Sequence, residues 1–132
     1  MYLVDTNVWL ERLLEQERFD EVRRFLDSTE TSRLFLTDFS FHSIGLILTR
    51  LKKSELLLNV VQDVLLEGAT SLVHLAPEDT QALVGAMQQF QLDYDDAYQY
   101  VAAGKHNLNL VSFDADFDRT ERGRKQPHQV TA

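Results

Sequence analysis

The sequence contains no cysteine, and only two of its 132 residues are proline. The absence of cysteine excludes disulfide cross-links and thiolate metal sites. No apolar run approaches the roughly 18 residues of a membrane-spanning helix. The N-terminal residues do not form a secretory signal, because they lack a basic region and Asp5 interrupts their apolar run. We therefore expect a cytoplasmic protein without membrane association.

The chain also lacks internal repeats, low-complexity tracts and any linker rich in glycine, proline or serine. Its hydrophobic fraction of 44% and charged fraction of 26% are ordinary for a globular protein. A chain of this length is long enough to bury a core of its own. We expect residues 1–132 to form a single domain.

Basic residues are scarce, with 13 Lys and Arg against 21 Asp and Glu, which gives a net charge of −8. This balance argues against a protein that binds nucleic acid by electrostatic attraction alone. An enzyme that holds cations between carboxylates can nevertheless be acidic and act on a phosphodiester. Of two local basic clusters, the second follows an acidic motif and is the better candidate for a phosphate contact. The clusters are Arg50, Lys52 and Lys53, and then Arg119, Arg122, Arg124 and Lys125.

Short apolar segments alternate with stretches of helical periodicity along the chain. This alternation predicts an α/β fold with a largely parallel sheet. The expected strands are residues 2–4, 34–36, 72–75 and 108–113, with a further edge strand near Val130. The expected helices are about 7–16, 19–28, 38–51 and 54–66, and two more that begin near residues 77 and 94.

Three acidic residues share one position relative to these elements. Asp5 follows the first strand, Asp114 follows the strand at 108–113, and Asp96 lies in the first turn of the preceding helix. If the strands are parallel, their carboxyl ends meet at one sheet edge, where α/β proteins bind ligands. Asp116 could supply a fourth carboxylate.

Such a cluster has a clear chemical use. Neighbouring carboxylates repel one another unless a cation neutralises them, and oxygen ligands suit Mg²⁺ or Mn²⁺. A divalent ion can activate water and stabilise charge on a phosphate. Taken singly, each acid has a structural explanation, because Asp5 and Asp96 suit a helix start and Asp114 suits a loop. Their conjunction at strand ends favours a site.

The same residues resemble the PIN domain family, the nuclease fold of VapC-type toxins. Val4-Asp5-Thr6-Asn7 matches the family's opening motif of an apolar strand and an Asp-Thr/Ser-Asn/Ser triplet. Asp96-Ala97, the small-residue helix at 100–103 and Ser112-Phe113-Asp114-Ala115-Asp116-Phe117 match its late motif. The resemblance covers essentially the whole chain.

The resemblance implies a three-layer α/β/α sandwich that hydrolyses RNA phosphodiester bonds with Mg²⁺ or Mn²⁺. It makes Asp5, Asp96 and Asp114 metal ligands, and Asp116 a further ligand or a group that positions water. Side chains expected to orient these carboxylates are Thr6, Asn7, Ser112 and His42. It also implies a homodimer held inactive by a small antitoxin. Trp9, Leu13 and Phe19 are possible antitoxin contacts, although core packing is the more common use of such residues.

One position departs from the family pattern. The family places a glutamate on the helix after the second strand, where this chain has His42 or Ser43. His42 is interpreted as an interior or boundary histidine bonded to backbone, with Mn²⁺ ligation as the alternative. Asp38 or Asp95 could replace the missing carboxylate. The departure motivates a second hypothesis, a PIN-like regulatory module that binds RNA or protein and hydrolyses weakly or not at all.

A phosphoryl-transfer fold of the receiver or haloacid-dehalogenase type is a third hypothesis, since both use an Asp after a strand. The dehalogenase pattern requires a second Asp where this chain has Asn7, and a receiver requires an acidic pair near the first strand, which is absent. Acyl transfer lacks both a cysteine and a Gly-x-Ser-x-Gly motif.

Overall fold

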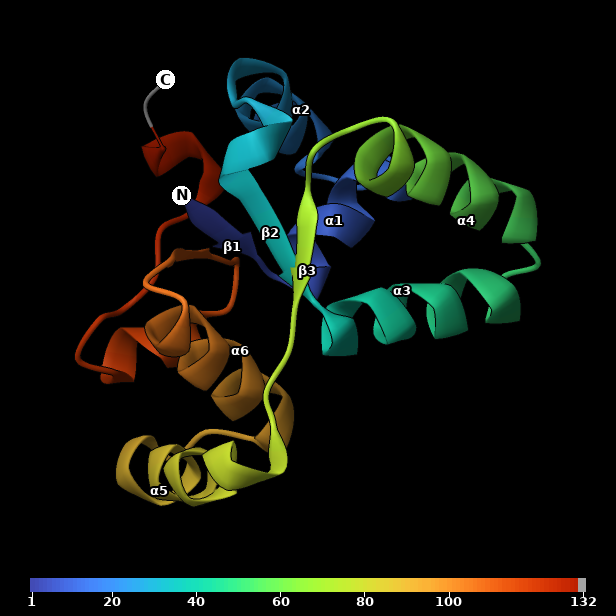
Figure 1. The fold of residues 1–132 in the computed structure, drawn as a ribbon. Coiled ribbons are helices and arrows are strands. Elements are labelled where there is room, and N and C mark those ends of the chain that lie inside the picture. The colour runs from blue at the N-terminus through green and yellow to red at the C-terminus, as the bar shows by residue number, and fades with distance from the viewer. Residues whose placement is uncertain (131–132) are drawn as a thin grey trace.

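A four-stranded parallel sheet forms the centre of the computed structural model, which describes residues 1–130 (Figure 1). The strand order is β3-β2-β1-β4, so β1 lies inside the sheet, with Leu3 aligned to Phe35 of β2 and to Leu110 of β4. The expected parallel sheet is confirmed. The strands are β1 (Tyr2–Val4), β2 (Leu34–Thr37), β3 (Ser71–Val73) and β4 (Asn109–Val111).

Helices cover both faces of this sheet. Side chains alternate along a strand, so Leu3 packs with α5 and α6 on one face, while Tyr2 and Val4 pack with α1 to α4 on the other. The predicted three-layer α/β/α sandwich is therefore confirmed. Within residues 1–130, no helix has the length and apolar character needed to span a membrane. The helices are α1 (Thr6–Leu13), α2 (Phe19–Ser28), α3 (Asp38–Arg50), α4 (Ser54–Val60), α5 (Thr80–Phe90) and α6 (Tyr94–Lys105).

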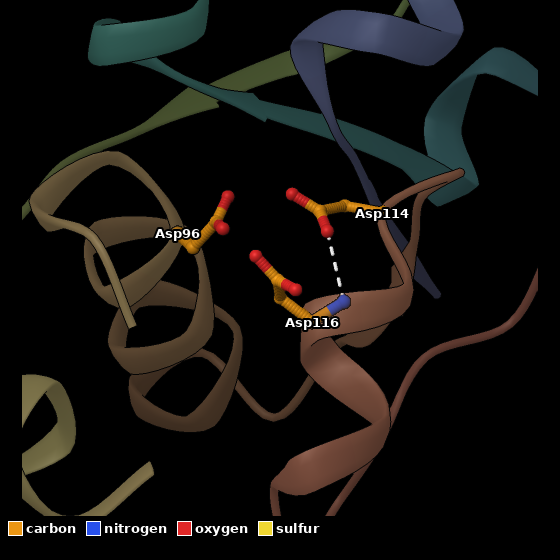
Figure 2. A group of neighbouring side chains, drawn as sticks. All are labelled: Asp96, Asp114 and Asp116. Atoms are coloured by element: carbon orange, nitrogen blue, oxygen red, sulfur yellow. Dashed lines mark hydrogen bonds between the residues drawn. The ribbon is translucent and has the colours of Figure 1, made fainter. Parts of the chain in front are cut away.

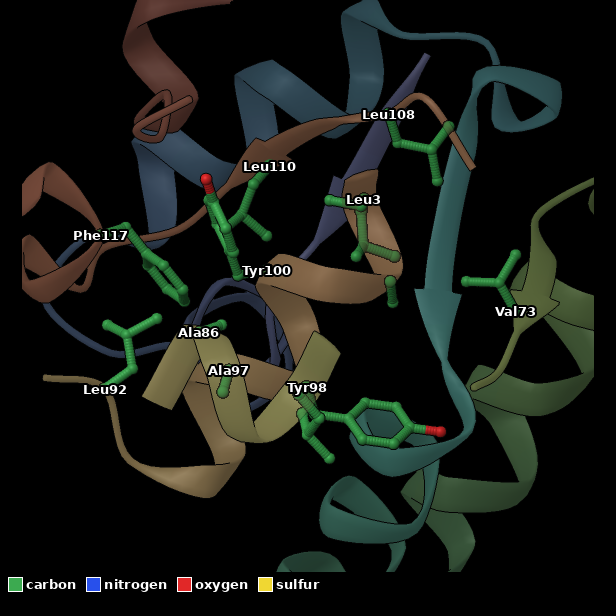
Figure 3. Packing of buried hydrophobic residues seen from close by; sticks show 13 residues of the cluster. Leu3, Val73, Ala86, Leu92, Ala97, Tyr98, Tyr100, Leu108, Leu110 and Phe117 are labelled. Atoms are coloured by element: carbon green, nitrogen blue, oxygen red, sulfur yellow. The ribbon is translucent and has the colours of Figure 1, made fainter. Parts of the chain in front are cut away.

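Small side chains on α6 determine where its N-terminus lies. Ala97 and Ala102 are fully buried, and Ala103 nearly so, in the cluster that contains Leu3 and Leu110 (Figure 3). Because alanine adds little bulk, the helix packs close to β1 and β4. Its first turn therefore lies beside the ends of these two strands.

Several predicted boundaries shift. The helix expected at 54–66 is α4 followed without interruption by a π-helical segment, Val61–Leu66. The strand expected at 108–113 ends at Val111, because the chain then turns into a loop. Trp9 and Leu13 belong to the core on the α1 side of the sheet, as the core-packing interpretation expects.

The edge strand predicted near Val130 is wrong. Lys125 instead forms a single parallel bridge with Val111, and the chain then enters a 3-10 turn at Pro127–Gln129. The amide of Val130 donates to the carbonyl of Pro127 within that turn. Proline has no N–H for a strand ladder and its fixed φ suits a turn, so it ends the pairing with β4.

Candidate active site

Three carboxylates converge at the carboxyl edge of the sheet. Asp96, in the first turn of α6, faces Asp114 and Asp116 from the loop after β4 (Figure 2). One carboxylate oxygen from each residue lies within 4.8 Å of the others. Asp114 caps the 3-10 helix Ala115–Arg119, and its Oδ1 accepts a hydrogen bond of 2.8 Å from the amide of Asp116. This cap holds two of the acids side by side.

The convergence is electrostatically unfavourable. Partial burial raises the pKa of Asp96 to about 7, and its interactions with Asp114, Asp5 and Asp116 add to the shift. Near neutral pH, Asp96 is therefore partly protonated. The guanidinium of Arg119 relieves part of the repulsion, since its Nη1 lies 3.0 Å from Oδ1 of Asp116. A cation among these oxygens would relieve more of it.

Asp5 lies next to this cluster in a different environment. The residue is only 7% exposed, and it caps α1. Its Oδ1 accepts hydrogen bonds from the amide of Thr6 at 2.8 Å and from Nε2 of Gln99 at 3.0 Å. Its Oδ2 accepts from the hydroxyl of Ser112 at 2.7 Å. Burial raises the pKa of Asp5, while these hydrogen bonds act against the rise.

Gln99 connects Asp5 to α3 and β2 through buried polar groups. The hydroxyl of Thr37 donates to Oε1 of Gln99 at 2.9 Å, and Nε2 of Gln99 also donates to the hydroxyl of Ser40. Thr6 donates to the same Ser40 oxygen at 2.8 Å. Sequence reasoning did not identify Gln99. The available signal is its place one helical turn after Asp96, in a stretch otherwise made of small and aromatic residues.

Asn7 and Ser112 hold the loop that carries Asp114. The hydroxyl of Ser112 accepts a hydrogen bond of 3.0 Å from the backbone amide of Asp114. The side-chain Oδ1 of Asn7 accepts one of 3.3 Å from the backbone amide of Phe113. The side-chain Nδ2 of Asn7 also donates to the hydroxyl of Ser112 at 3.4 Å. These contacts link the opening triplet to the late motif.

The acids line a pocket of about 280 Å³ between α1, α3 and α6. Asp5, Asp95, Asp96 and Asp114 contribute to it, and so does Ser43. Of the two residues that could stand at the glutamate position, Ser43 thus lines the acidic pocket. His42 and Asp38 line a neighbouring pocket instead. His42 is exposed, so its interpretation as an interior or boundary histidine is wrong.

The second basic cluster is largely committed to structure. Arg122 stacks on the ring of Tyr100 at 3.9 Å from the ring centre and donates to the Tyr100 carbonyl. Arg124 pairs with Asp118 at 3.1 Å. Arg119, by its contact with Asp116, is the member of this cluster that lies at the acidic site.

Comparisons with known proteins agree with this arrangement. A model of the PIN domain family matches residues 2–123, whereas no curated protein matches the sequence. FitAcB from Neisseria gonorrhoeae superposes with a TM-score of 0.78 at 21% identity, over 98% of this chain and 100% of the other.

Two further solved structures are similar. A toxin–antitoxin complex from Klebsiella pneumoniae gives a TM-score of 0.77 at 16% identity, over 98% of this chain and 100% of the other. VapC20 of Mycobacterium tuberculosis, described as a sarcin–ricin loop cleaving toxin, gives 0.78 at 17% identity, over 96% and 100%. Likeness at these identities establishes the fold. The family match spans nearly the whole sequence, and the chain therefore belongs to the PIN domain family.

Proposed function

We propose that this protein is a metal-dependent endoribonuclease that hydrolyses RNA phosphodiester bonds. The observation that carries the proposal is the approach of Asp96, Asp114 and Asp116, with an oxygen from each within 4.8 Å of the others. Family membership supports it, since PIN domains are generally nucleases. Asp5, Asp96 and Asp114 are the proposed metal ligands, with Asp116 as a further catalytic acid.

The donor set fits Mg²⁺ or Mn²⁺. All four side chains offer carboxylate oxygens, the ligands these hard cations prefer. Among residues 1–130, Oδ2 of Asp5 accepts only the hydrogen bond from Ser112, and Asp5 lines the pocket, so this oxygen has capacity for a further ligand. When bound, a divalent cation would supply activation of water and neutralisation of charge on the phosphate.

The protein's own groups prepare this site. Asp96 would be one of the residues that hold the cation, and cation binding would favour the deprotonated carboxylate of Asp96. Ser112 and the cap at Asp116 keep Asp114 in one orientation. Arg119 balances part of the charge of Asp116 and lies where a phosphate oxygen could be bound.

We further propose that the protein is the toxin of a toxin–antitoxin pair, inhibited by a small antitoxin and active as a homodimer. Similar folds occur in toxin–antitoxin complexes. Leu46, Leu51 and Leu58 of the α3–α4 region are each about half exposed or more, and we propose that they contribute to the contact with such a partner.

Cleavage of single-stranded RNA with Mg²⁺ and with Mn²⁺ tests the nuclease proposal. Asp96→Asn should lower the cleavage rate at least about 100-fold, as loss of a ligand environment does in metal enzymes. Asp93→Asn is the matched control, because this exposed carboxylate lies three residues away and outside the cluster. Equal cleavage by wild type and Asp96→Asn would contradict the proposal.

The second candidate, a binding module with weak or no hydrolysis, is favoured by Ser43 in the acidic pocket. A serine there supplies no charge, where the family has a glutamate. Ser43→Glu should tighten Mn²⁺ binding and raise the cleavage rate of a weak nuclease. If wild type is stabilised by Mn²⁺ but neither it nor Ser43→Glu cleaves RNA, the binding module is the better description.

A further inference from the structure

A second pocket adjoins the acidic one and has a different lining. Its volume is about 400 Å³, and its walls include the rings of Phe39, Tyr94 and Tyr98 with the polar side chains of Asp38 and His42. Phe39 and Ser43 line both pockets, so the two pockets are adjacent. Tyr94 and Tyr98 occupy one face of α6, four residues apart, while Asp96 and Gln99 of the next face line the acidic pocket.

The three rings support one another. Their centres are 5.5 Å apart for Phe39 and Tyr98, 6.1 Å for Phe39 and Tyr94, and 6.2 Å for Tyr94 and Tyr98. Tyr98 is held further, because its hydroxyl donates to Asp38 Oδ1 at 2.8 Å and accepts from the amide of Leu75 at 3.0 Å. Tyr94 is nevertheless 48% exposed. The exposed ring of Tyr94 is thus supported by the buried ring of Tyr98 and the partly buried ring of Phe39.

We propose that this aromatic pocket binds an unpaired base of single-stranded RNA whose backbone crosses the acidic pocket. The inference rests on the proposed nuclease function and adds a base-binding subsite to it. Single-stranded RNA is recognised by stacking of bases on aromatic rings and by hydrogen bonds to base edges. A phosphate is a poor occupant, because Asp38 would repel it.

Asp38 suits the edge of a base. Among residues 1–130, its hydrogen bonds from the amide of Phe39 and the hydroxyl of Tyr98 both go to Oδ1. Oδ2 is therefore available to accept from an N–H group, and every RNA base offers one.

The test measures binding separately from cleavage. Short single-stranded RNAs carrying 2-aminopurine are titrated in Mg²⁺ into protein with the Asp96→Asn change, so that the RNA stays intact. Stacking quenches the probe at the position that enters the pocket. Adding Tyr94→Ala should remove this quenching and weaken binding about tenfold, the effect of losing one stacked base. Tyr94→Phe should keep both, and Val84→Ala, a similarly exposed change on α5, should leave both unaltered.

An RNA that lacks the base at the quenched position should bind with equal affinity to proteins that carry Tyr94 and to proteins that carry Tyr94→Ala. The inference is overturned if Tyr94→Ala leaves the affinity for intact RNA unchanged, if it weakens abasic RNA as much, or if no RNA binds. It is also overturned if Tyr94→Ala changes only the oligomeric state in size-exclusion chromatography, which would make the rings a protein contact.

If wild type cleaves RNA and Tyr94→Ala has no effect on binding, the nuclease proposal stands and the subsite fails. If binding depends on Tyr94 and no variant cleaves, the subsite stands and the nuclease fails.

Discussion

Asp5 and Asp96 are neighbours in one pocket, yet their carboxylates have different surroundings. Asp5 is buried and receives hydrogen bonds from Thr6, Gln99 and Ser112. Asp96 is partly exposed, and its neighbours Asp114 and Asp116 are themselves acids. Hydrogen-bond donors can hold a buried carboxylate in place without a cation. Facing carboxylates without enough hydrogen-bond donors repel one another and destabilise the fold, and a bound cation would reduce this repulsion.

This difference assigns the two acids different effects on folding. Removing Asp5 leaves buried donors without an acceptor, so it should destabilise the protein. Removing the charge of Asp96 takes away repulsion, so it should stabilise the protein without metal while abolishing the site. The free energy of unfolding, measured with and without metal, should therefore distinguish the role of Asp5 from that of Asp96.

The largest expected effect on stability is that of Asp5→Ala. It leaves donors on Gln99, Ser112 and Thr6 unpaired, which should lower the free energy of unfolding by about 3 kcal/mol. Asp5→Asn keeps one acceptor oxygen and should cost less. Urea unfolding followed by circular dichroism measures both changes. If Asp5→Ala were as stable as wild type, Asp5 would be no more tied to the fold than Asp96.

Gln99→Met should have the next largest effect, about 2 kcal/mol of lost stability. Methionine fills the space but leaves Asp5 without one donor and the Thr37 hydroxyl without its acceptor. Gln89→Met, at an exposed position of α5, is the control and should change stability little. Similar losses in both variants would mean that the Gln99 network contributes nothing beyond packing.

Stability without metal should fall as the pH rises through neutrality. The pKa of Asp96 is about 7 in the folded chain, above its usual 3.8, so the folded state keeps a proton that the unfolded chain has lost. That contribution is complete at low pH and disappears as the pH rises through about 7. The raised pKa of Asp5 acts in the same direction.

In EDTA, wild type should therefore lose about 1 kcal/mol of stability between pH 5 and pH 8, a figure reduced because water screens the cluster. Asp96→Asn should lose less stability over the same range. Millimolar Mn²⁺ should stabilise wild type more at pH 8 than at pH 5. Thermal unfolding across this pH range supplies the measurement. A wild-type curve identical to that of Asp96→Asn in EDTA would show that the cluster stores no repulsion.

The smallest expected effect is that of Arg119→Gln. Its pair with Asp116 is about half exposed, and its hydrogen bonds to the carbonyls of Phe90 and Gln91 are exposed as well. Their loss should therefore lower stability by less than about 1 kcal/mol. Without the guanidinium, Asp116 is free for a cation, and Mn²⁺ should bind about threefold more tightly. Isothermal titration calorimetry measures the affinity, with Arg23→Gln on α2 as a control for a lost surface charge. Weaker Mn²⁺ binding would instead make Arg119 a residue that positions Asp116 for the metal.

Much of the fold is predictable from local signals. Apolar segments such as Leu34–Leu36 and the helical stripes between them predict a parallel α/β sheet, because both faces of each strand must be covered. The tail near Val130 is not predictable in the same way. Its pairing with the sheet is limited to the bridge between Lys125 and Val111, and Pro127 ends that pairing. Which residue pairs across the sheet is a tertiary property.

The acidic residues were predictable because each lies within a few residues of a strand end or a helix start. Their supports were not. Gln99 acts on Asp5 across 94 positions of sequence, and no local pattern marks such a contact. The same applies to His42 and Ser43, adjacent in sequence, because a rotation of about 100° per residue along α3 decides which of them lines the acidic pocket.

The central place of β1 has a consequence for synthesis. Asp5 is made among the first residues, but the hydrogen bond from Ser112 comes 107 positions later, and β4 must pair with β1 before Asp114 can approach Asp96. Contacts this distant in sequence form only after the intervening chain has left the ribosome. A nascent chain that has emerged only as far as α5 therefore carries one isolated carboxylate and no cluster. Under the proposed function, the nascent chain therefore has no assembled metal site until β4 has paired with β1.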